Sequence, residues 1–75
     1  MAVVFRRNRQ FVIDQEYIKP ESRTTTVVNG LYSAIYEEFS GAASNTKYEK
    51  LTIAERMEVL NTFATDWLKT RGFYQ

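Results

Sequence analysis

The 75-residue sequence contains neither cysteine nor histidine. Without thiolates the chain forms no disulfide, and it lacks the sulfur ligands of zinc fingers and iron–sulfur clusters. Without imidazole it lacks the usual general base of enzymes and the commonest protein ligand for transition metals. We therefore expect a protein with no metal, no cofactor and no enzymatic activity.

Proline, glycine and long apolar runs are also scarce. The chain has one proline and three glycines, and no apolar run approaches the ~20 residues that a membrane-spanning helix needs. The N-terminal stretch MAVVFRRNRQ places its charges after a very short apolar run, which is the reverse of a secretory signal. These features predict no membrane segment and a cytoplasmic location, which is the host cytoplasm if the protein is viral.

What the sequence does contain is enough apolar material for a core, with 44% hydrophobic and 15% aromatic residues. A chain of this length buries only roughly 60% of its unfolded surface, so its margin of stability is thin. Natural proteins of this size often gain stability from disulfides, metals or a second copy of themselves. Because the first two are missing, we expect one domain over 1–75 that self-associates, most simply as a homodimer.

The C-terminal third, LTIAERMEVLNTFATDWLKTRGFYQ, predicts a helix over about 53–71. Thr52 and Glu55 have the spacing of a capping box, in which each side chain satisfies an unpaired amide of the first turn. Gly72 suits the left-handed position of a Schellman motif, after which Phe73 packs back on Leu68. The apolar stripe of this helix is formed by Ile53, Met57, Leu60, Ala64 and Trp67.

The stretch TTTVVNGLYSAIYEEF supports two structures. Asn29-Gly30 between β-branched and aromatic residues is typical of a hairpin, which would give a β-rich N-terminal half and one C-terminal helix. The spacing of the apolar residues is helical instead, and burying one Leu or Phe stabilises by roughly 1.5–3 kcal/mol, against about 1 kcal/mol lost for a helical glycine. We therefore predict a helix over about 25–40 that ends at Gly41, with Gly30 marking the close approach of another backbone. The four residues of the helical stripe are Val28, Leu31, Ile35 and Phe39.

The N-terminal part is typical of β-structure. The runs AVVF and QFVID are separated by RRNR, and Asn8 suits a tight turn. This pattern predicts a β-hairpin over about 2–18, before Pro20. A two-stranded hairpin is only marginally stable alone, so the sequence predicts an α+β fold with the hairpin packed on two helices in two layers.

The cluster of Arg6, Arg7 and Arg9 has two interpretations. It could contact phosphates of nucleic acid, most simply in a ribbon-helix-helix-like dimer whose paired strand would be RNRQFVID. Alternatively it is a solvated turn whose basic residues guard a sheet edge. We favour the second, because acidic residues follow closely and nucleic-acid modules usually carry a larger basic excess. The nearby Phe5 and Phe11 could stack on bases, but we expect them to face the core.

The aromatic content is the strongest functional indication. Aromatic residues, Met and Arg are enriched at protein–protein interfaces, and two helices and a hairpin leave little room to bury all of them. The sequence therefore predicts a non-enzymatic protein–protein interaction module that self-associates. It would act as an accessory or inhibitor protein by occupying a partner's surface, in the manner of compact viral or mobile-element proteins. The expected partner-binding residues are Tyr32, Tyr36, Phe63, Trp67 and Tyr74, with the arginine cluster helping orientation.

Overall fold

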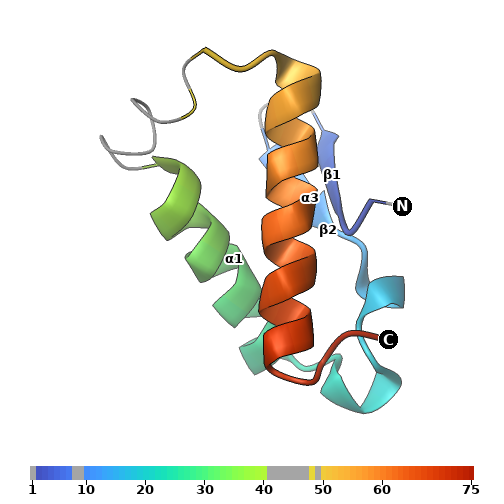
Figure 1. Ribbon diagram of the computed structural model, residues 1–75. Coiled ribbons are helices and arrows are strands. Elements are labelled where there is room, and N and C mark those ends of the chain that lie inside the picture. The colour runs from blue at the N-terminus through green and yellow to red at the C-terminus, as the bar shows by residue number, and fades with distance from the viewer. Residues whose placement is uncertain (1, 8–9, 41–47, 49) are drawn as a thin grey trace.

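A computed structural model of the chain describes residues 2–7, 10–40, 48 and 50–75. In chain order the elements are β1 (Val4–Arg7), β2 (Gln10–Ile13), the 3-10 turns η1 (Gln15–Tyr17) and η2 (Pro20–Ser22), α1 (Thr25–Ser40) and α3 (Ile53–Thr70). In Figure 1, α3 runs between α1 on one side and the hairpin on the other, and it contacts both α1 and β1. The predicted architecture, a hairpin packed on two helices, is confirmed.

The hairpin is shorter than the predicted 2–18. β1 and β2 pair antiparallel, with Val4 opposite Ile13 at the open end. β2 stops at Ile13 because the Asp14 carboxylate accepts a hydrogen bond from the Glu16 amide at 3.0 Å and starts the short helix η1. The predicted turn at Asn8 and the predicted helix stop at Gly41 lie outside the described residues.

The segment after β2 pairs with the C-terminal residues of the chain. Ile18 forms an antiparallel bridge with Tyr74, and the Lys19 amide donates to the Phe73 carbonyl at 2.8 Å. The core therefore draws on the connecting segments as well as on the regular elements. Its buried residues are Val3, Val4, Ile13, Ile18, Leu31, Ile35, Leu60, Ala64 and Leu68.

The helical interpretation of the middle stretch is confirmed, and the hairpin at Asn29-Gly30 is wrong. Both residues lie inside α1. The helix starts after Thr24, whose hydroxyl oxygen accepts a hydrogen bond from the Val27 amide at 3.2 Å. Leu31 is completely buried, so packing of the apolar stripe outweighs the unfavourable helix propensity of Asn and Gly.

Gly30 does mark a close approach, but to a side chain and not to another backbone. A Cβ atom at this position would lie 3.4 and 3.5 Å from two ring carbons of Trp67. The Arg71 guanidinium lies 4.0 Å from the centroid of the same ring. The missing side chain of Gly30 thus lets the indole ring of α3 lie directly against α1.

Both predicted ends of α3 are confirmed. The Glu55 amide donates to the Thr52 hydroxyl at 3.1 Å, and the Thr52 amide donates to the Glu55 carboxylate at 3.0 Å, which completes the capping box. The hydrogen bond from the Thr52 amide, and after it the interaction with the Thr52 hydroxyl, lower the pKa of the Glu55 carboxyl. At the other end, Gly72 has φ of 75° and the Phe73 amide donates to the Leu68 carbonyl at 2.9 Å, as in a Schellman motif.

Replacing Gly30 tests the contact between the helices. Gly30→Ala should raise the free energy of unfolding by about 0.5–1 kcal/mol, because alanine is the better helix former and its Cβ only touches Trp67. Gly30→Leu should lower it, because the larger side chain must displace the indole ring. Urea denaturation measures both variants. A destabilised Gly30→Ala protein would contradict the packing described here.

Candidate interaction surface

Side chains from both helices clamp the open end of the hairpin. The Val4 amide donates to the Asn61 side-chain oxygen at 2.6 Å, and the Ile13 amide donates to the Tyr32 hydroxyl oxygen at 3.2 Å. The Asn61 amide nitrogen in turn donates to the Met57 carbonyl at 2.9 Å. Because Val4 and Ile13 are paired, α3 and α1 each satisfy one of the outward-pointing amides of that pair.

The hydrogen bonds from the Val4 and Ile13 amides to Asn61 and Tyr32, called the clamp below, determine which hairpin side chains face solvent. Side chains alternate between the two faces of a strand, so Val4 and Ile13 face the core while the next pair, Phe5 and Val12, lies on the outer face. The side chains of Phe5 and Val12 are 47% and 45% exposed. The expectation that Phe5 faces the core is therefore wrong, whereas Phe11 does pack against the core.

Beside Phe5 lies a shallow hollow between β1 and the first turns of α3, with a volume of about 590 Å³. Ile53, the first residue of the predicted apolar stripe, forms part of its wall and is 68% exposed. As the first residue of α3, it lies at the end of the stripe, beyond the buried positions. The hollow is lined by Ala2, Val4, Phe5, Arg6, Ile53 and Met57. Phe5, Val12, Ile53 and Met57 together are called the apolar surface below.

The edge of β1 contributes backbone polar groups to the same hollow. The Val4 amide points outward to α3, and outward-pointing groups recur at every second residue of an antiparallel strand. The N–H and C=O of Arg6 therefore point to the same edge, and they have no hydrogen-bond partner among the described residues. Unpaired edge groups of this kind can pair with another chain.

The five predicted partner-binding residues do not come together in one surface. Phe63 packs edge-to-face on Phe39 of α1, with ring centroids 5.7 Å apart. Trp67 lies between Gly30 and Arg71, as described above, and Tyr74 stacks on Tyr17 at 6.3 Å. Phe63, Trp67 and Tyr74 are all partly buried against the core, so each has a structural role within the chain.

The other two predicted residues, Tyr32 and Tyr36, share one side of α1. Their rings lie 5.6 and 5.8 Å from that of Phe11. Tyr32 also holds the hairpin, whereas Tyr36 is 61% exposed. A second shallow hollow lies here, lined by Asn29, Tyr32, Ser33, Tyr36 and Glu37, and these residues are called the tyrosine face below.

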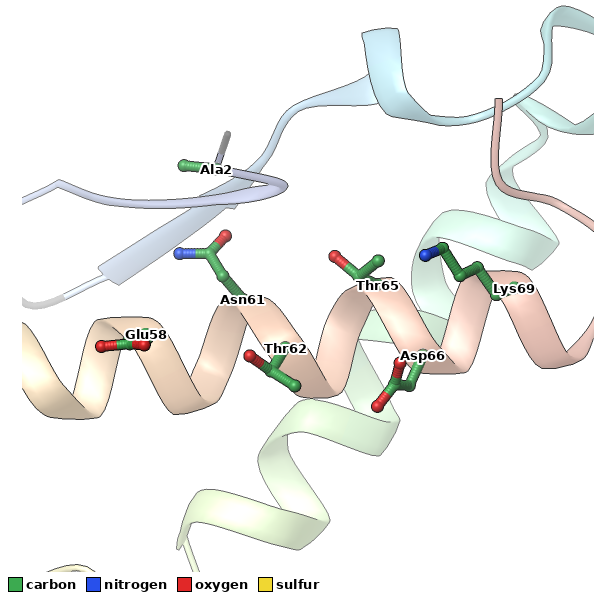
Figure 2. A pocket seen from close by; sticks show the side chains of 7 residues that line it. All are labelled: Ala2, Glu58, Asn61, Thr62, Thr65, Asp66 and Lys69. Atoms are coloured by element: carbon green, nitrogen blue, oxygen red, sulfur yellow. The ribbon is translucent and has the colours of Figure 1, made fainter.

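A third hollow, shown in Figure 2, follows the polar side of α3. In this view Asn61 and Thr65 point toward the segment that carries Ala2. Its two carboxylates, Glu58 and Asp66, are separated by about 12 Å along the helix axis, too far to act on one bond as a carboxylate pair. Among the described residues no three potential metal ligands cluster together. The hollow is lined by Ala2, Glu58, Asn61, Thr62, Thr65, Asp66 and Lys69.

Two of the three predicted arginines can be placed. Arg6 and Arg7 lie on β1 and are exposed, and neither forms an ion pair within the described part of the chain; Arg9 lies outside it. The strand proposed for a ribbon-helix-helix-like dimer is not a lone strand, because β2 already pairs with β1 of the same chain. Arg6 is the one charged residue in the lining of the apolar hollow.

Comparisons with models of protein families, with curated proteins and with solved structures found no match. Across the described ranges, no helix has both the length and the apolar character required to traverse a lipid bilayer. The functional interpretation therefore depends on the geometry of the surface itself.

The clamp can be tested with one hydroxyl group. Tyr32→Phe keeps the ring but leaves the partly buried Ile13 amide without its partner, which should cost about 1–3 kcal/mol of unfolding free energy. Tyr36→Phe is the matched control, because that side chain is mostly exposed and its hydroxyl bonds to none of the described residues. Chemical denaturation of the two variants gives the comparison. Equal stabilities would show that the Tyr32 hydroxyl does not hold the hairpin.

Proposed function

We propose that the chain is a non-enzymatic protein–protein interaction module, an accessory or inhibitor protein that acts in the cytoplasm by occupying a partner's surface. The observation that carries this proposal is the apolar surface. Phe5, Val12 and Ile53 are 45–68% exposed, and Phe5 and Ile53 line the same hollow. Grouped exposed apolar residues mark interaction sites.

The apolar surface has the rigidity that a binding site needs. In the hairpin ladder, Phe5 and Val12 form the pair next to Val4 and Ile13, whose amides are held by α3 and α1. Ile53 is the first residue of α3, whose N-terminus is fixed by the capping box. Side chains held by an ordered backbone lose less conformational entropy on binding than those of a mobile loop. The aromatic residues between the helices are equally ordered but are partly buried against the core, which favours the apolar surface.

Self-association is part of the proposal, with the tyrosine face as its contact. Glu37 is the one charged residue lining this face, so a two-fold contact brings few like charges together. A two-fold contact through the apolar surface would instead set Arg6 and Arg7 against their own copies. Tyrosine also provides a large contact area with few rotatable bonds.

Sedimentation velocity at micromolar concentrations tests the self-association. The wild-type protein should sediment as a dimer and Tyr36→Ser as a monomer, because that substitution removes the most exposed aromatic ring of the described residues. Phe5→Ser serves as the matched control and should remain dimeric. A folded wild-type monomer would remove self-association from the proposal and leave binding to another protein in place.

Affinity capture from the cells that make the protein tests the apolar surface. The wild-type protein should recover a partner in near-stoichiometric amount, and the double variant Phe5→Ser/Ile53→Ser should lose it. Thr62→Ala, in the polar hollow of Figure 2, is the control and should retain the partner. Circular dichroism checks that the double variant is folded. The same partner on all three proteins would contradict the assignment of the site.

A further inference from the structure

We propose that the apolar surface binds an extended, acidic segment of the partner protein, which adds along the free edge of β1. This inference rests on the proposed function and names the kind of partner that the surface fits. Its three supports are the backbone groups of Arg6, the apolar hollow beside them, and the side chains of Arg6 and Arg7. Within the described part of the chain, neither these backbone groups nor these side chains have a bonding partner.

The backbone geometry favours an extended segment. Arg6 presents its N–H and C=O to the edge of β1, next to the hollow, and no residue in the ranges 2–7, 10–40, 48 and 50–75 pairs with them. A strand that joins a sheet edge pairs with such groups. The outward amide of Val4 is already hydrogen-bonded to Asn61, so it cannot pair with an added strand. The added segment therefore forms a short contact centred on Arg6, and its side chains must supply most of the affinity.

The lining of the hollow favours an apolar side chain of the partner segment. Phe5 lies on one side of it and Ile53 and Met57 on the other, so an inserted aliphatic or aromatic side chain would touch both β1 and α3. Side chains of an extended segment alternate in direction. The residues that flank the inserted one therefore lie on the opposite face of the added segment. Arg6 and Arg7 are adjacent on β1, so their side chains also alternate and one arginine lies on that face.

The positive charges of Arg6 and Arg7 favour acidic residues in the partner segment. Arg6 lines the hollow and Arg7 follows it on the exposed strand, and neither has an ionic partner among the described residues. Arginine can form two parallel hydrogen bonds with one carboxylate. Glu55, in the first turn of α3 close in sequence to Ile53, is already bonded to the Thr52 amide.

Nucleic acid is the less favoured occupant. Phosphate groups would use Arg6 and Arg7 but would leave the hollow between Phe5 and Ile53 without a function. The formal net charge of +1 also gives little of the basic excess that nucleic-acid-binding domains carry.

Fluorescence anisotropy with defined probes tests the inference. The first probe is a fluorescein-labelled peptide of alternating glutamate and leucine, which should bind the wild-type protein. Peptides of alternating lysine and leucine or of alternating glutamate and serine should bind at least roughly tenfold more weakly, because each lacks one of the two complementary features. A single-stranded oligonucleotide of the same length is the fourth probe.

Matched variants locate the binding site on β1. Arg6→Gln/Arg7→Gln should weaken binding of the glutamate–leucine peptide roughly tenfold at low ionic strength, and added salt should reduce the difference. Lys69→Gln/Lys50→Gln removes the same number of positive charges outside β1 and should leave the affinity unchanged. Phe5→Ser should weaken binding without changing its salt dependence.

The outcomes separate this inference from the proposed function. Suppose that affinity capture depends on Phe5 and Ile53, but the acidic peptide does not bind or binds equally well to the arginine variant. The inference of an acidic partner segment is then wrong, and the proposed interaction module stands. Tighter binding of the oligonucleotide than of the peptide would overturn both in favour of nucleic-acid recognition.

Discussion

The pair of hydrogen bonds that joins the Val4 and Ile13 amides to Asn61 and Tyr32 is the constraint on which the rest of the structure depends. A two-stranded ribbon is marginally stable alone, and a chain without cross-links has few ways to hold one. Satisfying the two outward amides also sets the register of the hairpin against the helices. A slip of one residue would exchange its two faces, burying Phe5 and exposing Val4.

The apolar surface follows from that register together with the length of α3. The buried positions of this helix begin at Leu60 and continue to Leu68, where the hairpin and α1 both cover it. Ile53 lies two turns earlier, beside the part of the hairpin that extends beyond the clamp. The same geometry that closes the core therefore leaves Phe5 and Ile53 on either side of an open hollow.

Local features were predictable from the sequence, and contacts between distant segments were not. The capping box of Thr52 and the Schellman motif at Gly72 each involve residues within one or two turns, so their spacing alone identifies them. The contact of Gly30 with Trp67 joins two helices, and no local pattern says whether a glycine faces a ring or a backbone.

The apolar surface was missed because AVVF does not alternate polar and apolar residues, so the run does not reveal which of its side chains faces out. The exposure of Tyr36 was easier to anticipate, because this residue lies just beside the apolar stripe of its helix.

The interpretation of the arginine cluster as a guard of the sheet edge is compatible with partner recognition once Arg6 is placed on a strand edge. A charged side chain on an exposed edge discourages pairing with an identical edge, because two copies would bring like charges together. The same charge favours a segment that carries carboxylates, and discrimination between partners commonly combines such repulsion with attraction. In the proposed complex Arg6 serves both purposes: its side chain excludes a second copy from the hollow, and its backbone groups and charge accept an acidic strand there. Protection of the edge and recognition of a partner would then be two consequences of one residue at one position.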